Sequence, residues 1–499
     1  MCKSFFYREK ERHEGKWQIM NKLYINGDWV ESTSNEIITV LNPATEEVIG
    51  EVPKGTKEDV DRAVDGAFTA QKKWAKESGA TRAEVARKIG EAIERDKEEW
   101  IRLLVQEQGK TMDYARGEID KSIQYCHYMA GFGLRMEGDT LPSERENEML
   151  LVLKKPIGVV GGIVPWNFPV FVMLRKVIPP LVAGCSVVIK PSTETPLTAY
   201  KFAELVHELG LAPGLFQLVP GSGSEVGNAI AAHEKVSLVT MTGSFPAGSK
   251  VMEAAATNVK KVNLELGGKA PVIVTQNADI DEAVEHIVQS RIVNTGQVCT
   301  NAERVYVQES VIDTFNEKMA ERMKAVKYGD PLKDSSVEMG PLISQDQLDD
   351  VVSAVQEAKE EGATIVVGGH AVTDRKGFFF EPTVITNAKH EMKIMTEEIF
   401  GPVLPITSYE TLDQVIDWAN DSEYGLSSSI FTNDYNEMMR AINELNFGEV
   451  YVNREHDEAI HGYHAGWRKS GVGGADGKYG FEDYLATTVA YLQYDRTKQ

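Results

Sequence analysis

Short apolar segments alternate with helical segments along most of the chain. The first series of apolar segments covers residues 157–164, 186–189, 216–219 and 238–241. The second series covers residues 270–274, 304–307, 365–367 and 428–431. Strands that are buried on both faces and separated by helices are typical of a parallel α/β sheet. The pattern therefore predicts two doubly wound units that follow one another in the chain.

The remaining segments predict helices, a first strand and a projecting hairpin. Residues 22–30 have a strand pattern, whereas residues 57–74 and 81–108 have the pattern of amphipathic helices. Residues 140–155 combine a polar turn with an apolar run, which predicts a hairpin, and residues 487–494 predict a strand. Because exposed apolar strand edges are usually paired or covered, we expect these two pieces to form a subunit interface. A solvent-facing edge strand is the alternative.

The overall charge limits the partners that the chain can bind. The 499 residues carry a formal net charge of −22, and 42% of them are hydrophobic. A chain of this length has room for two or three domains. Because phosphate groups attract basic surfaces and repel acidic ones, we expect neither nucleic acid nor a membrane as a partner.

Cysteine usage indicates a reducing, cytoplasmic setting. The chain contains four cysteines without paired spacing, namely Cys2, Cys126, Cys185 and Cys299. This spacing indicates neither a disulfide framework nor a zinc site.

No segment is predicted to cross a membrane or to direct export. The longest uncharged stretch, residues 156–174, contains three prolines and three glycines, which favour a buried strand and loop. Residues 1–19 are rich in Lys, Arg and Glu and lack the apolar run of a signal peptide. We interpret them as a disordered or loosely docked N-terminal extension, with Met20 as an alternative start.

Two glycine-containing turns are candidates for binding an anion. Residues 220–227 lie between an apolar strand and a helix, where backbone N–H groups can approach a phosphate, although such a turn is common without a ligand. Gly243 and Ser244 follow the next strand, and we expect Ser244 to cap the helix after it. Lys190 ends a further strand and so lies at the carboxyl edge, where open α/β sheets bind ligands.

A thiol and a carboxylate are candidates for covalent acyl chemistry. Cys299 lies in the segment 294–301, and Glu265 precedes Gly267 and Gly268. A cysteine nucleophile with a carboxylate base can form and hydrolyse a thioester. A single free cysteine is also a common filler of protein cores.

Six motifs resemble those of the aldehyde dehydrogenase superfamily in order and spacing. They are residues 165–169 (PWNFP), 190–192 (KPS), 242–244 (TGS), 265–269 (ELGGK), 296–299 (GQVC) and 397–402 (EEIFGP). The resemblance covers residues 22–495. Within the superfamily, residues 451–455 and 462–471 look most like those of lactaldehyde/glycolaldehyde dehydrogenases.

The resemblance implies a fold and a division into domains. The fold is α/β and aldehyde-dehydrogenase-like, with two doubly wound parallel-sheet domains plus a small oligomerisation β-hairpin. The domains are an N-terminal extension (1–19), an NAD(P)-binding domain (20–139 and 156–266), a catalytic domain (267–467) and oligomerisation strands (140–155 and 484–499). A homodimer or homotetramer is expected.

The resemblance also implies catalytic roles. Cys299 would attack an aldehyde to give a thiohemiacetal, whose oxyanion the Asn167 amide and the Cys299 backbone N–H would stabilise. Hydride transfer to NAD or NADP would leave a thioester. Glu265 would act as general base for its hydrolysis, and deprotonation of the Cys299 thiol is an additional role open to it.

Fifteen residues are expected to bind the dinucleotide by the same resemblance. They are Ile163, Val164, Pro165, Trp166, Lys190, Ser192, Thr193, Gly223, Gly227, Gly243, Ser244, Leu266, Gly267, Glu398 and Phe400. NAD-preferring members often carry a Glu where this chain has Thr193. Because a hydroxyl does not repel a 2′-phosphate, we expect NAD as cofactor with appreciable use of NADP.

The expected substrate is a small 2-hydroxyaldehyde such as lactaldehyde or glycolaldehyde. The resemblance implies a polar pocket formed by Arg175, Glu458 and His464, which would serve a substrate hydroxyl. An anionic aldehyde, such as sulfolactaldehyde, glyceraldehyde phosphate or succinic semialdehyde, is an alternative because Arg175 can pair with an anion. A metal-dependent hydrolase built on His456, His461 and His464 is a further alternative, although their spacing is not that of H-E-x-x-H and no metal is expected.

Overall fold

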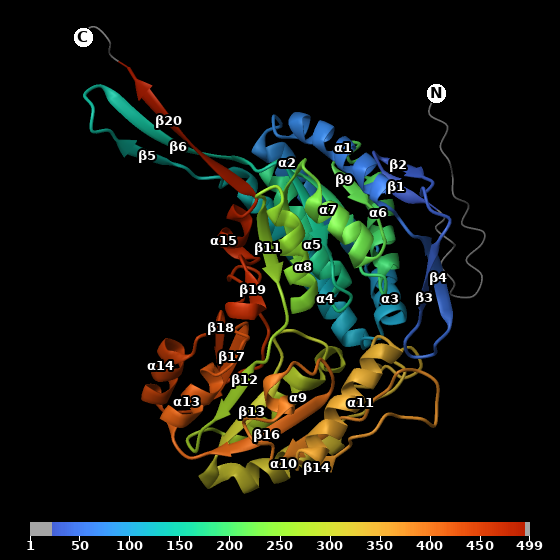
Figure 1. Cartoon of the computed structure of the whole chain (residues 1–499), viewed down its shortest axis with the longest axis vertical. Coiled ribbons are helices and arrows are strands. Elements are labelled where there is room, and N and C mark those ends of the chain that lie inside the picture. Colours follow the sequence, from blue (N-terminus) through green and yellow to red (C-terminus); the bar gives the residue numbers. More distant parts are fainter. Residues whose placement is uncertain (1–21, 495–499) are drawn as a thin grey trace.

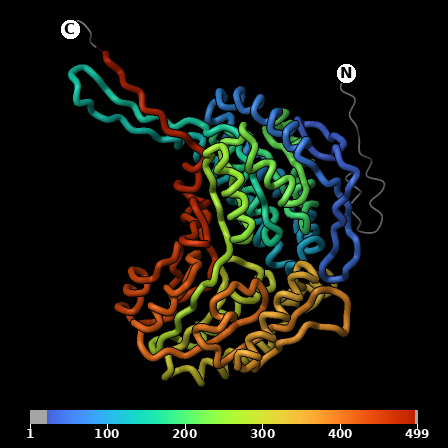
Figure 2. The backbone as a smooth tube through the Cα atoms, viewed as in Figure 1, coloured from blue at the N-terminus to red at the C-terminus, as the bar shows by residue number. Residues whose placement is uncertain are grey.

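The computed structural model describes residues 22–494 as two α/β units with a β-sheet arm that projects from one side (Figure 1). The predicted extension 1–19 lies outside the described residues, as do residues 495–499 at the end of the predicted oligomerisation strand. The tube view follows the chain from the first unit, through the second, and back to the arm (Figure 2).

The first unit is built on an eight-stranded sheet with the order β19-β11-β10-β7-β8-β9-β1-β2. Its strands are β1 (Leu23–Ile25), β2 (Asp28–Val30), β7 (Val159–Ile163), β8 (Ser186–Lys190), β9 (Phe216–Leu218), β10 (Val236–Thr242), β11 (Lys261–Glu265) and β19 (Gly471–Val472). The strands from β11 to β9 run parallel, and antiparallel strands cover both edges. Every residue of β7 and β8 is buried, as the apolar runs predict.

Helices cover the first sheet. They are α1 (Lys57–Trp74), α2 (Gly79–Arg95), α3 (Lys97–Gln108), α4 (Met112–Ala130), α5 (Pro169–Ala183), α6 (Pro196–Glu208), α7 (Asn228–Ala232) and α8 (Phe245–Ala256). The helical pattern over residues 81–108 corresponds to two helices that meet at Asp96, whose backbone is not helical (φ −101°, ψ 19°). Aspartate favours such caps because its carboxylate competes with the helical hydrogen bonds.

The second unit is built on a seven-stranded sheet with the order β14-β15-β16-β13-β12-β17-β18. Its strands are β12 (Pro271–Val274), β13 (Arg304–Gln308), β14 (Thr364–Val367), β15 (Thr383–Thr386), β16 (Val403–Tyr409), β17 (Ser427–Phe431) and β18 (Glu449–Val452). Its main helices are α9 (Ile280–Ile292), α10 (Ile312–Lys324), α11 (Gln345–Glu360), α13 (Leu412–Asn420) and α14 (Tyr435–Glu444).

One predicted member of the second parallel series runs in the opposite direction. The apolar run 365–367 lies in β14, which pairs antiparallel with β15 at the edge of the sheet. Exposed and half-buried residues alternate along it, as expected for a strand with one face toward solvent. A run of three apolar residues is too short to distinguish this strand from a central parallel one.

The arm is a three-stranded antiparallel sheet in which β6 lies between β5 and β20. Its strands are β5 (Asp139–Pro142), β6 (Glu148–Pro156) and β20 (Leu485–Gln493). The predicted hairpin and C-terminal strand therefore exist and pair with each other, from Leu485 opposite Pro156 to Gln493 opposite Glu148. A separate two-stranded sheet joins β3 (Ile37–Leu41) and β4 (Val48–Pro53).

The chain crosses between the two units along two adjacent segments. The first crossing leaves β11 at Glu265 and enters β12, and the second returns from β18 to β19. The Leu266 N–H donates to the Ser470 carbonyl (2.8 Å), and the Ser470 hydroxyl donates to the Gly267 carbonyl (2.7 Å). These bonds tie the crossings together. Among residues 22–494, no helix is both long and apolar enough to span a membrane.

Candidate active site

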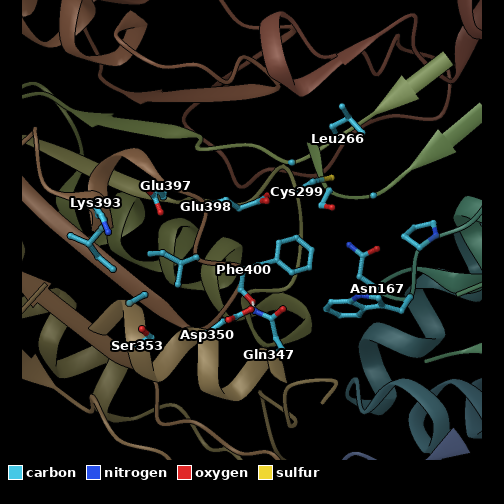
Figure 3. Close-up of a pocket in the computed structure, with 18 of the residues that line it drawn as sticks. Asn167, Leu266, Cys299, Gln347, Asp350, Ser353, Lys393, Glu397, Glu398 and Phe400 are labelled. Atoms are coloured by element: carbon cyan, nitrogen blue, oxygen red, sulfur yellow. Dashed lines mark hydrogen bonds between the residues drawn. The ribbon is translucent and has the colours of Figure 1, made fainter. Parts of the chain in front are cut away.

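A cleft of about 470 Å³ lies where the loops of the first sheet meet the second unit (Figure 3). Ten of the residues that the sequence singles out line it, namely Pro165, Trp166, Asn167, Gly243, Ser244, Leu266, Gly267, Cys299, Glu398 and Phe400. The loops after β7, β10 and β11 supply seven of them, so the cleft lies at the carboxyl edge of the sheet.

Left-handed backbone brings Cys299 to the cleft. Asn294 and Thr295 have φ values of 49° and 60°, and Gly296 has a φ of 77°. A side chain at Gly296 would also collide with the Gly401 carbonyl oxygen, which lies 2.2 Å from the position of a Cβ atom. The glycine before Cys299 is therefore required by the turn that presents the thiol.

Asn167 is fixed against the cysteine loop. Its side-chain amide donates to the Gln297 carbonyl (3.0 Å), and its own carbonyl accepts from the Asn294 amide (3.1 Å) and from Lys110 Nζ (2.9 Å). Asn167 is buried. Because its neighbours hold both the backbone and the side chain, the amide has a fixed position relative to Cys299.

A buried ion pair supports Asn167 from behind. Lys110 and Glu118 are fully buried and paired. The other oxygen of Glu118 accepts from the Val170 and Phe171 N–H groups (2.9 and 3.0 Å) in the first turn of α5. Glu118 thus accepts hydrogen bonds from N–H groups that have no partner within α5, while Lys110 holds the Asn167 carbonyl.

Glu265 ends β11 as a buried carboxylate. Its Oε2 accepts from the Thr242 hydroxyl (3.1 Å), whereas its Oε1 has no hydrogen-bond partner among the described residues. Burial raises the pKa of Glu265, but the charges of His464 and Lys176 outweigh it, so the pKa lies below its ordinary value. The carboxylate is therefore ionised at neutral pH, with one oxygen free to accept a proton.

The glycine at position 267 leaves room for the Glu398 side chain. A Cβ at Gly267 would lie 2.2 Å from Glu398 Oε2, and the adjacent Gly268 N–H donates to Glu398 Oε1 (2.9 Å). Burial, with repulsion from Glu303, raises the pKa of Glu398 to about 8. The Phe400 ring packs edge-on against Trp166, with a centroid distance of 5.4 Å.

The remaining predicted dinucleotide residues lie at the ends of β7 and β8 and in the turn after β9, outside the cleft lining. Ile163 pairs with Lys190 across these strands, and a Cβ at Gly227 would lie 3.7 Å from each of their side chains. Burial lowers the pKa of Lys190 to about 8, and its Nζ donates to the Pro191 carbonyl (2.7 Å). The others are Val164, Ser192, Thr193 and Gly223.

Two details of the predicted phosphate site differ from expectation. Ser244 occupies the N-cap position of α8, but its side chain makes no capping hydrogen bond. The hydroxyl therefore remains available in the cleft. In the turn 220–227, residues Gly223–Gly227 form a π-helical turn, and the Ser222 hydroxyl accepts from the Glu225 N–H (3.2 Å).

These residues fit a dinucleotide. The cleft has backbone without side chains at Gly243 and Gly267, a half-buried carboxyl group at Glu398 that can hydrogen-bond to sugar hydroxyls, and the Ser244 hydroxyl. Lys190 adds a buried cation with a single hydrogen bond to a carbonyl. Glycine, hydroxyl and lysine groups at the carboxyl edge of a parallel sheet are the donors that a pyrophosphate and ribose require.

The three residues expected to bind substrate are close together outside the cleft lining, and two further carboxylates join them. Arg175 is buried on α5, and its guanidinium contacts Glu458 (3.0 Å) and both carboxylate oxygens of Asp476 (Nε to Oδ1, 3.0 Å). His464 Nδ1 lies 3.0 Å from Glu449 Oε1. Asp476 and Glu449 carried no sequence motif, so sequence reasoning missed them.

The cleft also contains residues from α11 and α12 (Lys393–Thr396) that sequence reasoning missed. They are Gln347, Asp350, Ser353, Ala354, Glu357, Lys393 and Ile394. An amphipathic helix pattern predicts which face of α11 packs inward, but it gives no sign that the rim of this face borders a ligand cleft.

Two of the three histidines considered for a metal site, His456 and His464, have separate partners. His456 Nδ1 bonds with the Ser290 hydroxyl (2.9 Å), whereas His464 bonds with Glu449. Across residues 22–494, no group of three or more His, Cys, Asp or Glu side chains is arranged to hold a metal ion. Cys126, Cys185 and Cys299 are free thiols.

A carbonyl compound bound at Cys299 would lie beside the glycine-lined part of the cleft, where the dinucleotide fits. The fold and the site together define a dinucleotide-dependent oxidoreductase of the α/β class. The aldehyde dehydrogenase family model matches residues 29–490. The chain belongs to this family, and it is an NAD(P)-dependent aldehyde dehydrogenase.

Individual relatives match over nearly the whole chain. Lactaldehyde dehydrogenase of Escherichia coli (strain K12) is 47% identical, with 95% of this chain and 99% of the relative covered, and a crystal structure of the Escherichia coli enzyme has a TM-score of 0.94. A 3,6-anhydro-L-galactose dehydrogenase in complex with NADP is 41% identical (TM-score 0.93; 95% and 100% covered). Betaine aldehyde dehydrogenase from Staphylococcus aureus in complex with NAD⁺ is 37% identical (TM-score 0.94; 96% and 96% covered).

The buried pair behind Asn167 predicts a stability effect. Lys110→Met leaves the Glu118 carboxylate buried without its cation, so we expect the free energy of unfolding to fall by about 3–5 kcal/mol in urea denaturation. Lys57→Met, which removes an exposed pair with Asp61, is the matched control and should cost at most about 1 kcal/mol. A loss for Lys110→Met no larger than that of the control would contradict this account.

Proposed function

We propose that the protein oxidises a small, uncharged 2-hydroxyaldehyde, such as lactaldehyde or glycolaldehyde, to the carboxylic acid. The observation that carries this proposal is the arrangement of Arg175 between Glu458 and Asp476, with His464 nearby. Such a group offers several donors and acceptors to a hydroxyl. The likeness to lactaldehyde dehydrogenase supports the same class of substrate.

The charges around Arg175 favour a neutral substrate over an anionic one. Arg175 contacts two carboxylates, those of Glu458 and Asp476, and a third, Glu265, adds a negative potential at the guanidinium. An anionic aldehyde would have to compete with these carboxylates for the same cation. A hydroxyl imposes no such repulsion and can hydrogen-bond to the group as it stands.

The chemistry would begin at Cys299. Its sulfur attacks the aldehyde carbon and forms a thiohemiacetal. The Asn167 amide and the Cys299 backbone N–H stabilise the oxyanion, because preformed donors cost no reorganisation when charge develops. When bound, the nicotinamide supplies the acceptor for the substrate hydride, and Gly243, Ser244, Gly267, Glu398 and Phe400 are the cleft residues that would hold the dinucleotide.

Glu265 would complete the reaction. The enzyme is left with a thioester at Cys299, and the free Oε1 of Glu265 accepts a proton from the water that attacks it. The sulfur is released and the carboxylic acid departs. Because its pKa lies below the ordinary value, Glu265 is ionised at neutral pH, which is the form that a general base requires.

Asn167→Ala tests the oxyanion role. We expect kcat with lactaldehyde to fall by about a hundredfold to a thousandfold, which corresponds to about 3 kcal/mol, while KM changes little. Steady-state kinetics measure both constants. The control is Asn443→Ala, which removes an exposed amide on α14 that donates to the Met439 carbonyl (2.7 Å). Equal kcat values for the two variants would refute the role of Asn167.

Arg175→Leu tests the substrate class. Losing a charged donor should raise KM for lactaldehyde by about a hundredfold, because hydrogen bonds to charged groups contribute about 1.5–3 kcal/mol. Propanal, which lacks the hydroxyl, is the internal control and should be affected far less. Arg175→Lys keeps the charge and should retain part of the discrimination. Equal effects on both aldehydes would overturn the assignment, whereas activity on propanal alone would leave the family reaction intact.

Thr193 supports NAD with appreciable use of NADP. This half-buried residue follows β8 and Lys190. Thr193→Glu should lower kcat/KM for NADP by about a hundredfold, since like charges brought together cost several kcal/mol. Thr193→Gln, which adds similar bulk without charge, is the control. A wild-type preference for NAD greater than roughly a thousandfold, about 4 kcal/mol, would contradict the proposal.

The β-sheet arm is proposed as an oligomerisation surface. Its exposed apolar side chains are Leu141, Met149, Leu153, Val489, Tyr491 and Leu492. The strand register places these side chains on both faces of the arm. Exposed apolar side chains on a sheet with free edges suit pairing with a second copy of the chain, in a homodimer or homotetramer.

A further inference from the structure

His464 links the nucleophile to a carboxylate that no motif marks. The Cys299 thiol and the His464 imidazole form a side-chain hydrogen bond. On the other side of the ring, Nδ1 lies 3.0 Å from Glu449 Oε1. Because Nδ1 faces the carboxylate, Nε2 is the ring nitrogen left for the sulfur. Cys299, His464 and Glu449 therefore form a continuous hydrogen-bonded chain.

The chain of three residues is held rigidly. His464 is 3% exposed, and its backbone exchanges two hydrogen bonds with Ala475 (3.0 and 2.7 Å). Glu449 is the first residue of β18, and its second oxygen accepts from the Tyr451 hydroxyl (2.8 Å). The ring thus cannot turn away from the thiol without breaking a buried ion pair.

We propose that Glu449 is a positioning residue that holds His464 as an imidazolium beside Cys299 and so increases the fraction of this thiol that is ionised. The nucleophile is then prepared by a Cys–His–Glu arrangement, and Glu265 remains free for the hydrolytic step. Glu449 acts only through His464. The proposal concerns the thiol and does not depend on which aldehyde the enzyme oxidises.

The proton balance of the step is simple. His464 already carries a proton on both ring nitrogens, so when the Sγ–H bond breaks its proton passes to solvent and the sulfur becomes a thiolate beside the imidazolium. The two N–H groups of the ring then donate to Sγ and to Glu449. No bond to carbon forms and nothing is oxidised or reduced. A thiolate is the nucleophilic form of cysteine, so the ion pair raises the reactive fraction.

The electrostatics around the pair have a definite direction. Burial lowers the pKa of His464, but Glu449 and the contact with Cys299 outweigh it and raise the pKa well above its ordinary value, while Arg175 opposes them. Burial raises the pKa of Cys299, His464 lowers it in partial compensation, and Glu458 and Glu398 raise it. Glu265 and Asp476 also face His464. Removing the Glu449 charge should therefore raise the pKa of the thiol.

The test is alkylation of Cys299 by iodoacetamide as a function of pH, without aldehyde or cofactor. Mass spectrometry of the Cys299 peptide reports the rate at this thiol alone, while Cys126 and Cys185 are buried. Below the pKa of the thiol, the rate follows the thiolate fraction. We expect Glu449→Gln to shift the profile upward by about one pH unit, which makes alkylation at a fixed lower pH about tenfold slower.

Matched variants separate positioning from general damage. Glu455→Gln removes a different carboxylate, whose Oε2 lies 3.0 Å from Nδ1 of His286, and should leave the profile unchanged. Glu449→Asp keeps the charge, so its pH profile should lie close to that of the wild type. His464→Gln should shift the profile upward at least as far as Glu449→Gln does. A wild-type profile in Glu449→Gln overturns the proposal. If that variant does not fold, a wild-type profile in His464→Gln does so instead.

Discussion

The hydrogen bonds of Asn167 connect the two sheet units at the point where chemistry is expected. Asn167 lies in the loop after β7 of the first sheet. It contacts Gln297 and Asn294, which belong to the loop that carries Cys299. The contact depends in turn on Lys110 and Glu118, which hold the Asn167 backbone and the first turn of α5. A small set of buried polar groups thereby fixes the distance between a donor and a thiol that lie far apart in the sequence.

The buried charged groups around this contact differ in whether their hydrogen-bonding capacity is fully used. Arg175 is balanced by Asp476 and Glu458, and the pair Lys110–Glu118 balances itself, so neither leaves an uncompensated ion. Glu265 and Lys190, in contrast, each keep capacity for a further hydrogen bond. By this difference the purely structural Lys110–Glu118 pair can be told apart from groups that await a ligand.

The central architecture could be predicted from the sequence because its strands are buried on both faces and read as apolar runs. The runs at 157–164 and 186–189 both correspond to neighbouring parallel strands. The direction of β14 could not be predicted, because pairing at a sheet edge depends on what the rest of the chain leaves open. The break at Asp96 was concealed by a hydrophobic period that continues through it.

The same division applies to the site. The segments around Asn167, Gly267 and Cys299 were found because their motifs are local, and they do line one cleft, although their chemical roles remain predictions. Asp476 and Glu449 were missed because they meet their partners across long sequence separations. Asp476 also has an unusual backbone (φ 68°, ψ 166°) that glycine would adopt more easily. Neither propensity nor periodicity predicts a carboxylate at such a position.

The tie between the two crossings limits how the molecule can deform. Leu266 and Gly267 on one crossing are bonded to Ser470 on the other, so the connection behaves as a double ribbon and not as a single flexible thread. A double ribbon bends readily across its flat face and resists twisting or stretching. Any opening of the cleft should therefore be a rotation of the two units about a single hinge axis that runs through the two crossings. Glu265 and His464 lie on these crossings, so they would move less than residues at the outer edge of the cleft.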